Sequence, residues 1–139
     1  MEDRYLFKAK RIDNGEWVQG ALFNGESHCI IGQEIKFSPY TEHECKIVGY
    51  EVDKDTICQC TGLKDKNGKL IWENDVVRDE QGNFYKAFWQ NNYYQFSWVC
   101  VKTDVFLIGT KWDLWSIKSF EIEVIGNIFD NPELLESEG

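Results

Sequence analysis

The side chains best suited to metal binding are concentrated in the N-terminal half of the sequence. Six of them occur there as three close pairs: His28, Cys29, His43, Cys45, Cys58 and Cys60. Structural zinc sites usually take paired ligands separated by about two to four residues, whereas here the partners are adjacent or one residue apart. Free cysteine is also an ordinary small core residue. We therefore expect no metal site, and these six residues remain the only candidates for one.

Catalytic chemistry has even less support from the sequence. A cysteine nucleophile needs a neighbouring base, and no pattern places either histidine beside a particular cysteine. The 24 Asp and Glu residues form no motif for paired-carboxylate chemistry such as glycoside hydrolysis. The segment 65–68 imitates the start of a calcium loop, but apolar residues follow too early for the alternating ligands of such a loop. We expect no catalytic residue, no cofactor and no enzymatic activity.

A dense group of aromatic side chains occupies residues 84–98. A base-stacking platform would lie in a basic groove, but only Lys86 is interleaved here and the net charge is −9. Core packing is the better explanation, with alternate residues on one face of a strand: Tyr94, Phe96, Trp98 and Cys100. The opposite face predicts a protein–protein interface, because tyrosine and tryptophan are favoured there: Tyr85, Trp89 and Tyr93.

The acidic charge is spread over both halves of the chain. A field of this sign repels phosphate backbones and anionic membrane surfaces, and it favours solubility or a basic protein partner. Met1–Arg4 contains no apolar run typical of a signal peptide, and the odd number of cysteines, 5, suits a reducing compartment. We therefore expect a cytoplasmic protein without membrane association.

Short strands separated by turn signals would position these residues. Asn14-Gly15, Asn24-Gly25 and the hairpin turn Lys66–Lys69 are such signals. We expect strands at 5–9, 16–23, 28–31, 34–37, 45–52, 75–78, 84–90, 93–101, 105–108 and 121–127, and one helical turn from Pro132. The fold class is mostly β (β-rich α+β), with N-terminal hairpins in residues 1–60 and a second subdomain in residues 61–139, together forming one unit.

Two blocks of the sequence resemble the YopX family of phage and prophage proteins. They are Thr61–Val77, which reads TGLKDKNGKLIWENDVV, and Glu123–Leu135, which reads EVIGNIFDNPELL. A weaker similarity to the family covers Phe7–Ala9 and Glu16–Gly20. Asn74 departs from the glycine that is usual in the family, although asparagine also tolerates a positive φ.

The resemblance implies a β-rich fold whose C-terminal part is a small SH3-like barrel, and it brings no established activity. It also implies structural roles for the signature residues. Glycines would serve turns or close approach (Gly62, Gly68 and Gly126), Asp75 would cap backbone amides, and apolar residues would enter the core: Leu63, Ile71, Trp72, Val76 and Val77.

The expected function follows from the resemblance, the acidity and the surplus of aromatic residues. We expect a non-enzymatic phage or prophage accessory protein in the cytoplasm of a bacterial host. It would act through protein–protein contacts, as a homo-oligomer and with a possible host or phage protein partner. The alternative is a nucleic-acid-associated or nucleic-acid-mimicking acidic regulator, although the charge argues against direct nucleic-acid binding.

Overall fold

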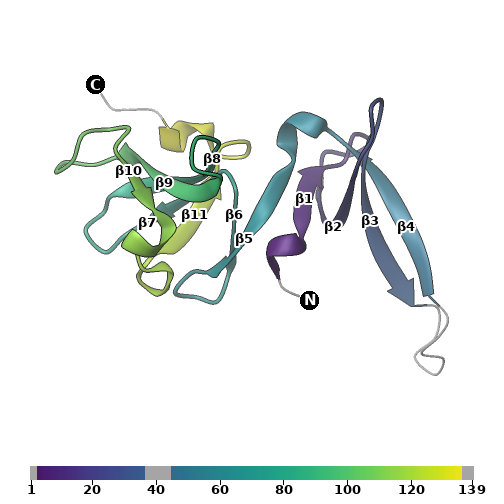
Figure 1. The fold of residues 1–139 in the computed structure, drawn as a ribbon, viewed down its shortest axis with the longest axis horizontal. Coiled ribbons are helices and arrows are strands. Elements are labelled where there is room, and N and C mark those ends of the chain that lie inside the picture. The colour runs from purple at the N-terminus through teal and green to yellow at the C-terminus, as the bar shows by residue number, and fades with distance from the viewer. Residues whose placement is uncertain (1–2, 37–44, 136–139) are drawn as a thin grey trace. The chain divides into compact units, whose positions relative to one another are not determined.

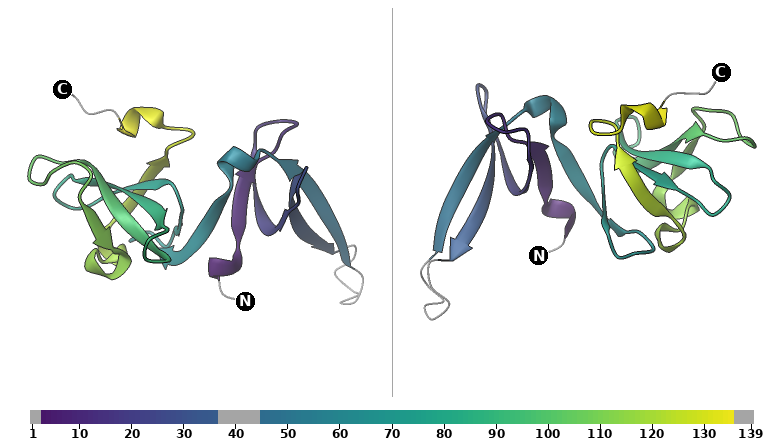
Figure 2. Two further views of the ribbon diagram at one scale, coloured as in Figure 1. Left: turned by 45° about the horizontal axis from the view of Figure 1, so that its top comes forward. Right: turned by 180° about the vertical axis from the view of Figure 1, so that it is seen from behind.

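The computed structural model describes residues 3–36 and 45–135, within two compact units that span 1–59 and 60–139 (Figure 1). Each unit consists of strands and short helical turns, as the further views in Figure 2 also show. Every helix in the described residues is a 3₁₀-helix of three or four residues. The expected mostly β fold is therefore confirmed. None of these short helices has the length or apolar character needed to cross a membrane.

In the first unit the strands lie in the order β4-β3-β2-β1-β5, and neighbouring strands are antiparallel. The elements are η1 (Asp3–Tyr5), β1 (Phe7–Lys10), β2 (Trp17–Asn24), β3 (Cys29–Lys36), β4 (Cys45–Val52), η2 (Lys54–Thr56) and β5 (Cys58–Lys64), which continues into the second unit. One face of this sheet carries the core residues Ala9, Val18, Cys29, Ile31 and Val52.

The separate strands predicted at 28–31 and 34–37 are wrong, because β3 runs without a break from Cys29 to Lys36. Gly32 lies in the middle of this strand and pairs with Ala21 on one side and Gly49 on the other. Hydrogen bonding to two neighbouring strands keeps the backbone extended through the glycine, although glycine alone is a weak strand former. Phe37 lies outside the described residues.

In the second unit, β6 pairs with β5, and a five-stranded antiparallel sheet has the order β10-β9-β8-β7-β11. The elements are β6 (Leu70–Trp72), β7 (Asp75–Arg78), β8 (Phe84–Gln90), β9 (Gln95–Lys102), β10 (Lys111–Asp113), η3 (Leu114–Ser116), η4 (Ser119–Glu121), β11 (Glu123–Asn127) and η5 (Pro132–Leu135). The core residues are Ile71, Val77, Tyr85, Ala87, Trp98, Cys100 and Ile122.

The outer strands of this sheet are β10 and β11. Among the strand pairings of residues 60–135, none joins these two strands. The structure therefore shows an open sheet with apolar residues packed on one face. The closed SH3-like barrel stays a prediction.

The hairpin β8–β9 was predicted with a two-residue turn, but the structure has a four-residue turn at 91–94. Tyr94 lies in this turn with φ of 52° and is 83% exposed, so its predicted place on the core face is wrong. Trp98 and Cys100 are fully buried as expected. Tyr85, predicted on the opposite face, is also buried, because β8 contributes this ring to the core of the second unit.

The strand predicted at 105–108 is a loop between β9 and β10. The hydroxyl of Thr103 accepts hydrogen bonds from the backbone amides of Val105 and Phe106 at 3.0 and 3.2 Å, which turns the chain. Gly109 then takes a positive φ of 93°. The apolar run has strand-forming residues, but local side-chain bonding to the backbone competes with strand pairing at its start.

Candidate functional site

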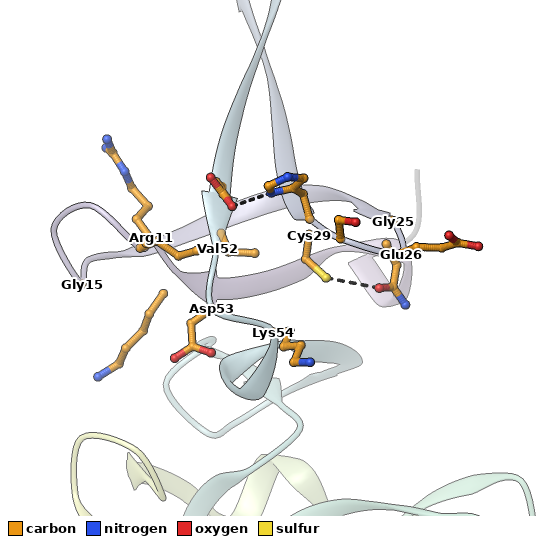
Figure 3. Close-up of a pocket in the computed structure, with 14 residues that line it drawn as sticks. Arg11, Gly15, Gly25, Glu26, Cys29, Val52, Asp53 and Lys54 are labelled. Carbon is orange, nitrogen blue, oxygen red and sulfur yellow. Dashed lines mark hydrogen bonds and ion pairs between the residues drawn. The ribbon is translucent and has the colours of Figure 1, made fainter.

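A hollow of about 640 Å³ opens in the first unit (Figure 3). Residues at the ends of β1 and β4 line it together with the turn between β2 and β3. The lining combines three cationic side chains, three carboxylates and one imidazole: Lys10, Arg11, Lys54, Glu26, Glu51, Asp53 and His28. It therefore carries no excess of either charge when the histidine is neutral.

His28 and Glu51 are in contact at this hollow, with Nδ1 2.7 Å from Oε1. A carboxylate beside an imidazole can orient the ring for proton transfer. The neighbouring Cys29 thiol donates instead to Asn24 Oδ1 at 3.2 Å (Figure 3). The imidazole and the thiol thus have different partners, and His28 does not activate Cys29 in this arrangement. Both side chains of the His28–Glu51 contact are at least half exposed, so the contact adds little to stability.

The arginine of the hollow is also engaged. Two nitrogens of the Arg11 guanidinium donate to the Asp13 carboxylate, Nε at 2.9 Å and Nη2 at 2.6 Å, and the group lies 4.5 Å from the centre of the Tyr50 ring. Lys10 lies 5.4 Å from the centre of the Trp17 ring. Arg11 and Lys10 thus have anionic or aromatic neighbours, and the lining has as many carboxylates as cations, so its charge does not favour an anion.

The cysteine and histidine candidates for metal binding that the structure describes are not brought together. The buried Cys58 thiol donates to the carbonyl of Thr56 at 3.3 Å, and the buried Cys60 thiol points to the carbonyl of Ile71 at 3.9 Å. Two candidates lie outside the described residues: His43 and the side chain of Cys45. Elsewhere in the described chain, no group of three or more His, Cys, Asp or Glu residues is placed to hold a metal.

The family-like segment Thr61–Val77 contains a buried carboxylate with a backbone role. Asp75 is 2% exposed, and its Oδ2 accepts a hydrogen bond from the amide of Trp72 at 2.8 Å. The capping role expected for Asp75 is confirmed. Asn74 takes a positive φ of 73° in the adjacent turn, so asparagine does replace the usual glycine there.

Asp65 is a second carboxylate of this kind, and its role was not predicted. Its Oδ1 accepts from the amides of Asn67 and Lys69, and its Oδ2 accepts from the amide of Val124, each at 2.9 Å. Burial by itself would raise the pKa of Asp65, but these backbone hydrogen bonds outweigh it and lower the pKa below its usual value. Asp65 thus joins the β5–β6 hairpin to the start of β11.

Asp79 repeats the arrangement in the turn between β7 and β8. Its Oδ1 accepts from the amides of Gln81 at 3.0 Å and Asn83 at 2.8 Å, and its Oδ2 accepts from the Tyr85 hydroxyl at 2.8 Å. Burial opposes ionisation, but hydrogen bonds from Asn83 and Tyr85 lower the pKa of Asp79 overall. Burial, followed by the bond to Asp79, raises the pKa of Tyr85, so the hydroxyl stays protonated and donates.

Both carboxylates share a sequence signal that could have revealed them. Asp65 and Asp79 each precede a glycine by three residues, Gly68 and Gly82, whose φ angles are 80° and 85°. In both turns the glycine amide donates to the backbone carbonyl of the aspartate. An aspartate that opens a turn commonly accepts from amides two residues ahead, which is the Asx-turn pattern.

Large apolar side chains are exposed on both sides of β10 in the sequence. In the loop before it, Val105 is 76% exposed and Leu107 83%, and after it Trp115 is 81% exposed and Phe120 65%. We call these four residues the β10-flanking residues. The separate aromatic face predicted on the β8–β9 hairpin is wrong, because Trp89 is paired with Phe96 and so lies on the same face as the core residues of β9. Trp89 and Tyr93 are nevertheless exposed, at 39% and 67%. Large exposed apolar side chains that follow one another closely in the chain are candidates for an interaction surface.

Comparison with known proteins decides the family. The YopX family model, described as YopX protein, matches residues 6–136. The chain belongs to the YopX family. Protein EF1440 from Enterococcus faecalis, whose crystal structure is solved, is similar at 27% identity and a TM-score of 0.54 over 94% of this chain and 96% of that one. A comparison with curated proteins gives no match.

Proposed function

We propose that this YopX-family chain is a non-enzymatic phage or prophage accessory protein, which works in the host cytoplasm through protein–protein contacts and self-association. The observation that carries the proposal is the exposure of the four β10-flanking residues. Such side chains lose unfavourable contact with water when a partner covers them.

A second copy of the chain is the partner that we propose for this surface. β10 is an outer strand of its sheet, and apolar residues flank it in the chain on both sides. A two-fold contact would let each copy bury the same residues on the other, which is the commonest arrangement of homo-oligomers. A host or phage protein would then bind elsewhere or compete for the same surface.

Light scattering after size-exclusion chromatography, repeated over a range of protein concentrations, tests this proposal. The wild-type chain should associate, and Leu107→Glu should weaken the association about tenfold or more, because a charge would enter an apolar interface. Ile47→Glu is the matched control, since Ile47 is 76% exposed but lies in the first unit. A monomer at every concentration, or equal weakening by both variants, would contradict self-association through this surface.

The net charge of −9 favours a second candidate function. An acidic regulator of this kind would occupy the basic groove of a nucleic-acid-binding host protein. If so, a host protein retained on the immobilised chain should be released by added double-stranded DNA at constant ionic strength. Retention that DNA does not affect would exclude mimicry for that partner.

A further inference from the structure

A second hollow, of about 300 Å³, lies in the second unit where several of its loops meet. It is lined by residues from the β7–β8 turn, β8, the β9–β10 loop, β10 and the segment around η4. Three aromatic rings take part: Tyr85, Phe106 and Trp112. The centre of the Trp112 ring is 5.5 Å from that of Tyr85 and 5.2 Å from that of Phe106, with interplanar angles of 87° and 71°. Both ring contacts of Trp112 are therefore T-shaped, with the edge of one ring against the face of the other.

The charges around this hollow are mainly negative. Asp79, Glu80 and Glu121 line it, against a single lysine, Lys118. The Asp79 carboxylate is fixed by four hydrogen bonds from its own turn and from Tyr85, which keep its pKa low. Lys118 directs its ammonium group toward Phe120, 5.9 Å from that ring, and Phe120 is not part of the lining.

We propose that this hollow binds the ammonium or guanidinium group of a basic side chain on a protein partner. Aromatic faces carry negative electrostatic potential and attract organic cations, and nearby carboxylates add to that attraction. A volume of about 300 Å³ lies at the low end for small-ligand pockets, so a side-chain head group fits better than a large cofactor. The net charge of −9 likewise favours a cationic group over an anionic one at this hollow.

The hollow also adjoins the β10-flanking residues. Phe106, which lines it, lies between Val105 and Leu107 in the chain. Residues 116–118, which also line it, directly follow Trp115. A partner that covers these apolar residues would bring its own side chains to the mouth of the hollow. The inference rests on the proposed function and specifies the chemistry of that contact.

Nuclear magnetic resonance titration of the full chain tests the site with small probes. We expect n-butylammonium and n-propylguanidinium to shift the indole signal of Trp112 with saturation, and the neutral isostere n-butanol to bind several-fold more weakly. The cation that binds more tightly shows whether a lysine or an arginine side chain is preferred. Equal binding of butanol and both cations would overturn the proposal, because charge would then play no part.

Three charge variants should change the affinity for cations in different ways. Glu121→Gln should weaken binding of the cations about two- to fivefold, because it removes a carboxylate from the lining. Lys118→Gln should strengthen binding by a similar factor, because it removes the resident positive charge. Glu133→Gln, an exposed carboxylate on η5 outside the lining, should leave affinity unchanged. If all three variants bind alike, the hollow is not a cation site.

The outcomes also separate this inference from the proposed function. Suppose that the chain binds cations, never associates, and loses no partner on Leu107→Glu. The cation site would then stand, and the apolar contact would be rejected. Suppose instead that the chain associates, that Leu107→Glu abolishes this association, and that no cation binds. The apolar contact would then stand, and the cation site would be rejected.

Discussion

Single aspartates stabilise the turns of the second unit. Asp65, Asp75 and Asp79 each accept hydrogen bonds from backbone amides, and Asp65 and Asp75 are nearly inaccessible to water. A carboxylate that accepts several such bonds satisfies buried donors that would otherwise cost free energy. The acidic composition of the chain therefore contains a structural component as well as a surface charge. In the family-like segment Thr61–Val77, Asp65 and Asp75 have this role.

Asp65→Asn should lower the free energy of unfolding by about 1–3 kcal/mol, because an amide offers one acceptor oxygen where the carboxylate uses two. Its NH₂ group would face either the amide of Val124 or those of the hairpin. Urea denaturation measures the loss. Asp104→Asn makes the same chemical change at an exposed loop position and should stay within about 0.5 kcal/mol of wild type. Equal effects of the two variants would contradict the capping role.

Stability should decrease as the medium becomes acidic. The pKa values of Asp65 and Asp79 are lowered from 3.8, so near and below that pH the unfolded chain binds protons that the folded chain does not. Their contribution is complete above an unfolded pKa of about 3.8 and is lost as the pH falls through the lower folded values. Urea midpoints measured from about pH 5 downward should fall, and Asp65→Asn should reduce the slope. An unchanged slope in that variant would show that Asp65 does not contribute.

At the scale of elements, the first unit depends on a close approach of two strands. A Cβ atom added at Gly20 on β2 would lie 2.2 Å from the carbonyl oxygen of Gly32 on β3. A Cβ atom added at Gly32 would meet nothing closer than the Ile47 side chain at 3.7 Å. The close approach of the strands therefore requires glycine at position 20 but not at position 32, although both residues lie in strands.

Gly20→Ala should destabilise the first unit by about 1–3 kcal/mol, because backbone atoms on both strands would have to shift. Gly32→Ala is the matched control and should be neutral or slightly stabilising, since alanine restricts the unfolded chain more than glycine does. Thermal unfolding followed by circular dichroism compares the two. Similar melting temperatures for both variants would contradict the close approach.

The sequence predicted elements correctly where local signals and hydrophobic alternation agree. Asn14-Gly15 gave the β1–β2 turn, in which Gly15 has φ of 71°. The strand 84–90 matches the observed limits of β8. The prediction at 105–108 failed because strand-forming residues need a pairing partner, which sequence patterns do not show. Likewise, the hollow of Tyr85, Phe106 and Trp112 depends on contacts between residues distant in the chain, so no local pattern reveals it.

At the scale of the whole molecule, charge and apolar exposure oppose each other. Each copy carries a net charge of −9, which repels a second copy over distances up to the Debye length, about 10 Å at 0.1 M salt. The exposed β10-flanking residues favour association through a force that salt does not screen. Cation binding in the hollow, by contrast, depends on attraction between opposite charges.

Salt should therefore change the two proposed activities in opposite directions. Raising sodium chloride from about 0.05 M to about 0.5 M should strengthen self-association, because like charges on two copies are screened while the apolar contact is kept. The same change should weaken binding of n-butylammonium, because the carboxylates around the hollow are screened too. Sedimentation equilibrium and the titration of the Trp112 signal measure the two affinities on the same protein. Association that weakens with salt would mean that charge pairs, and not the β10-flanking residues, hold the copies together.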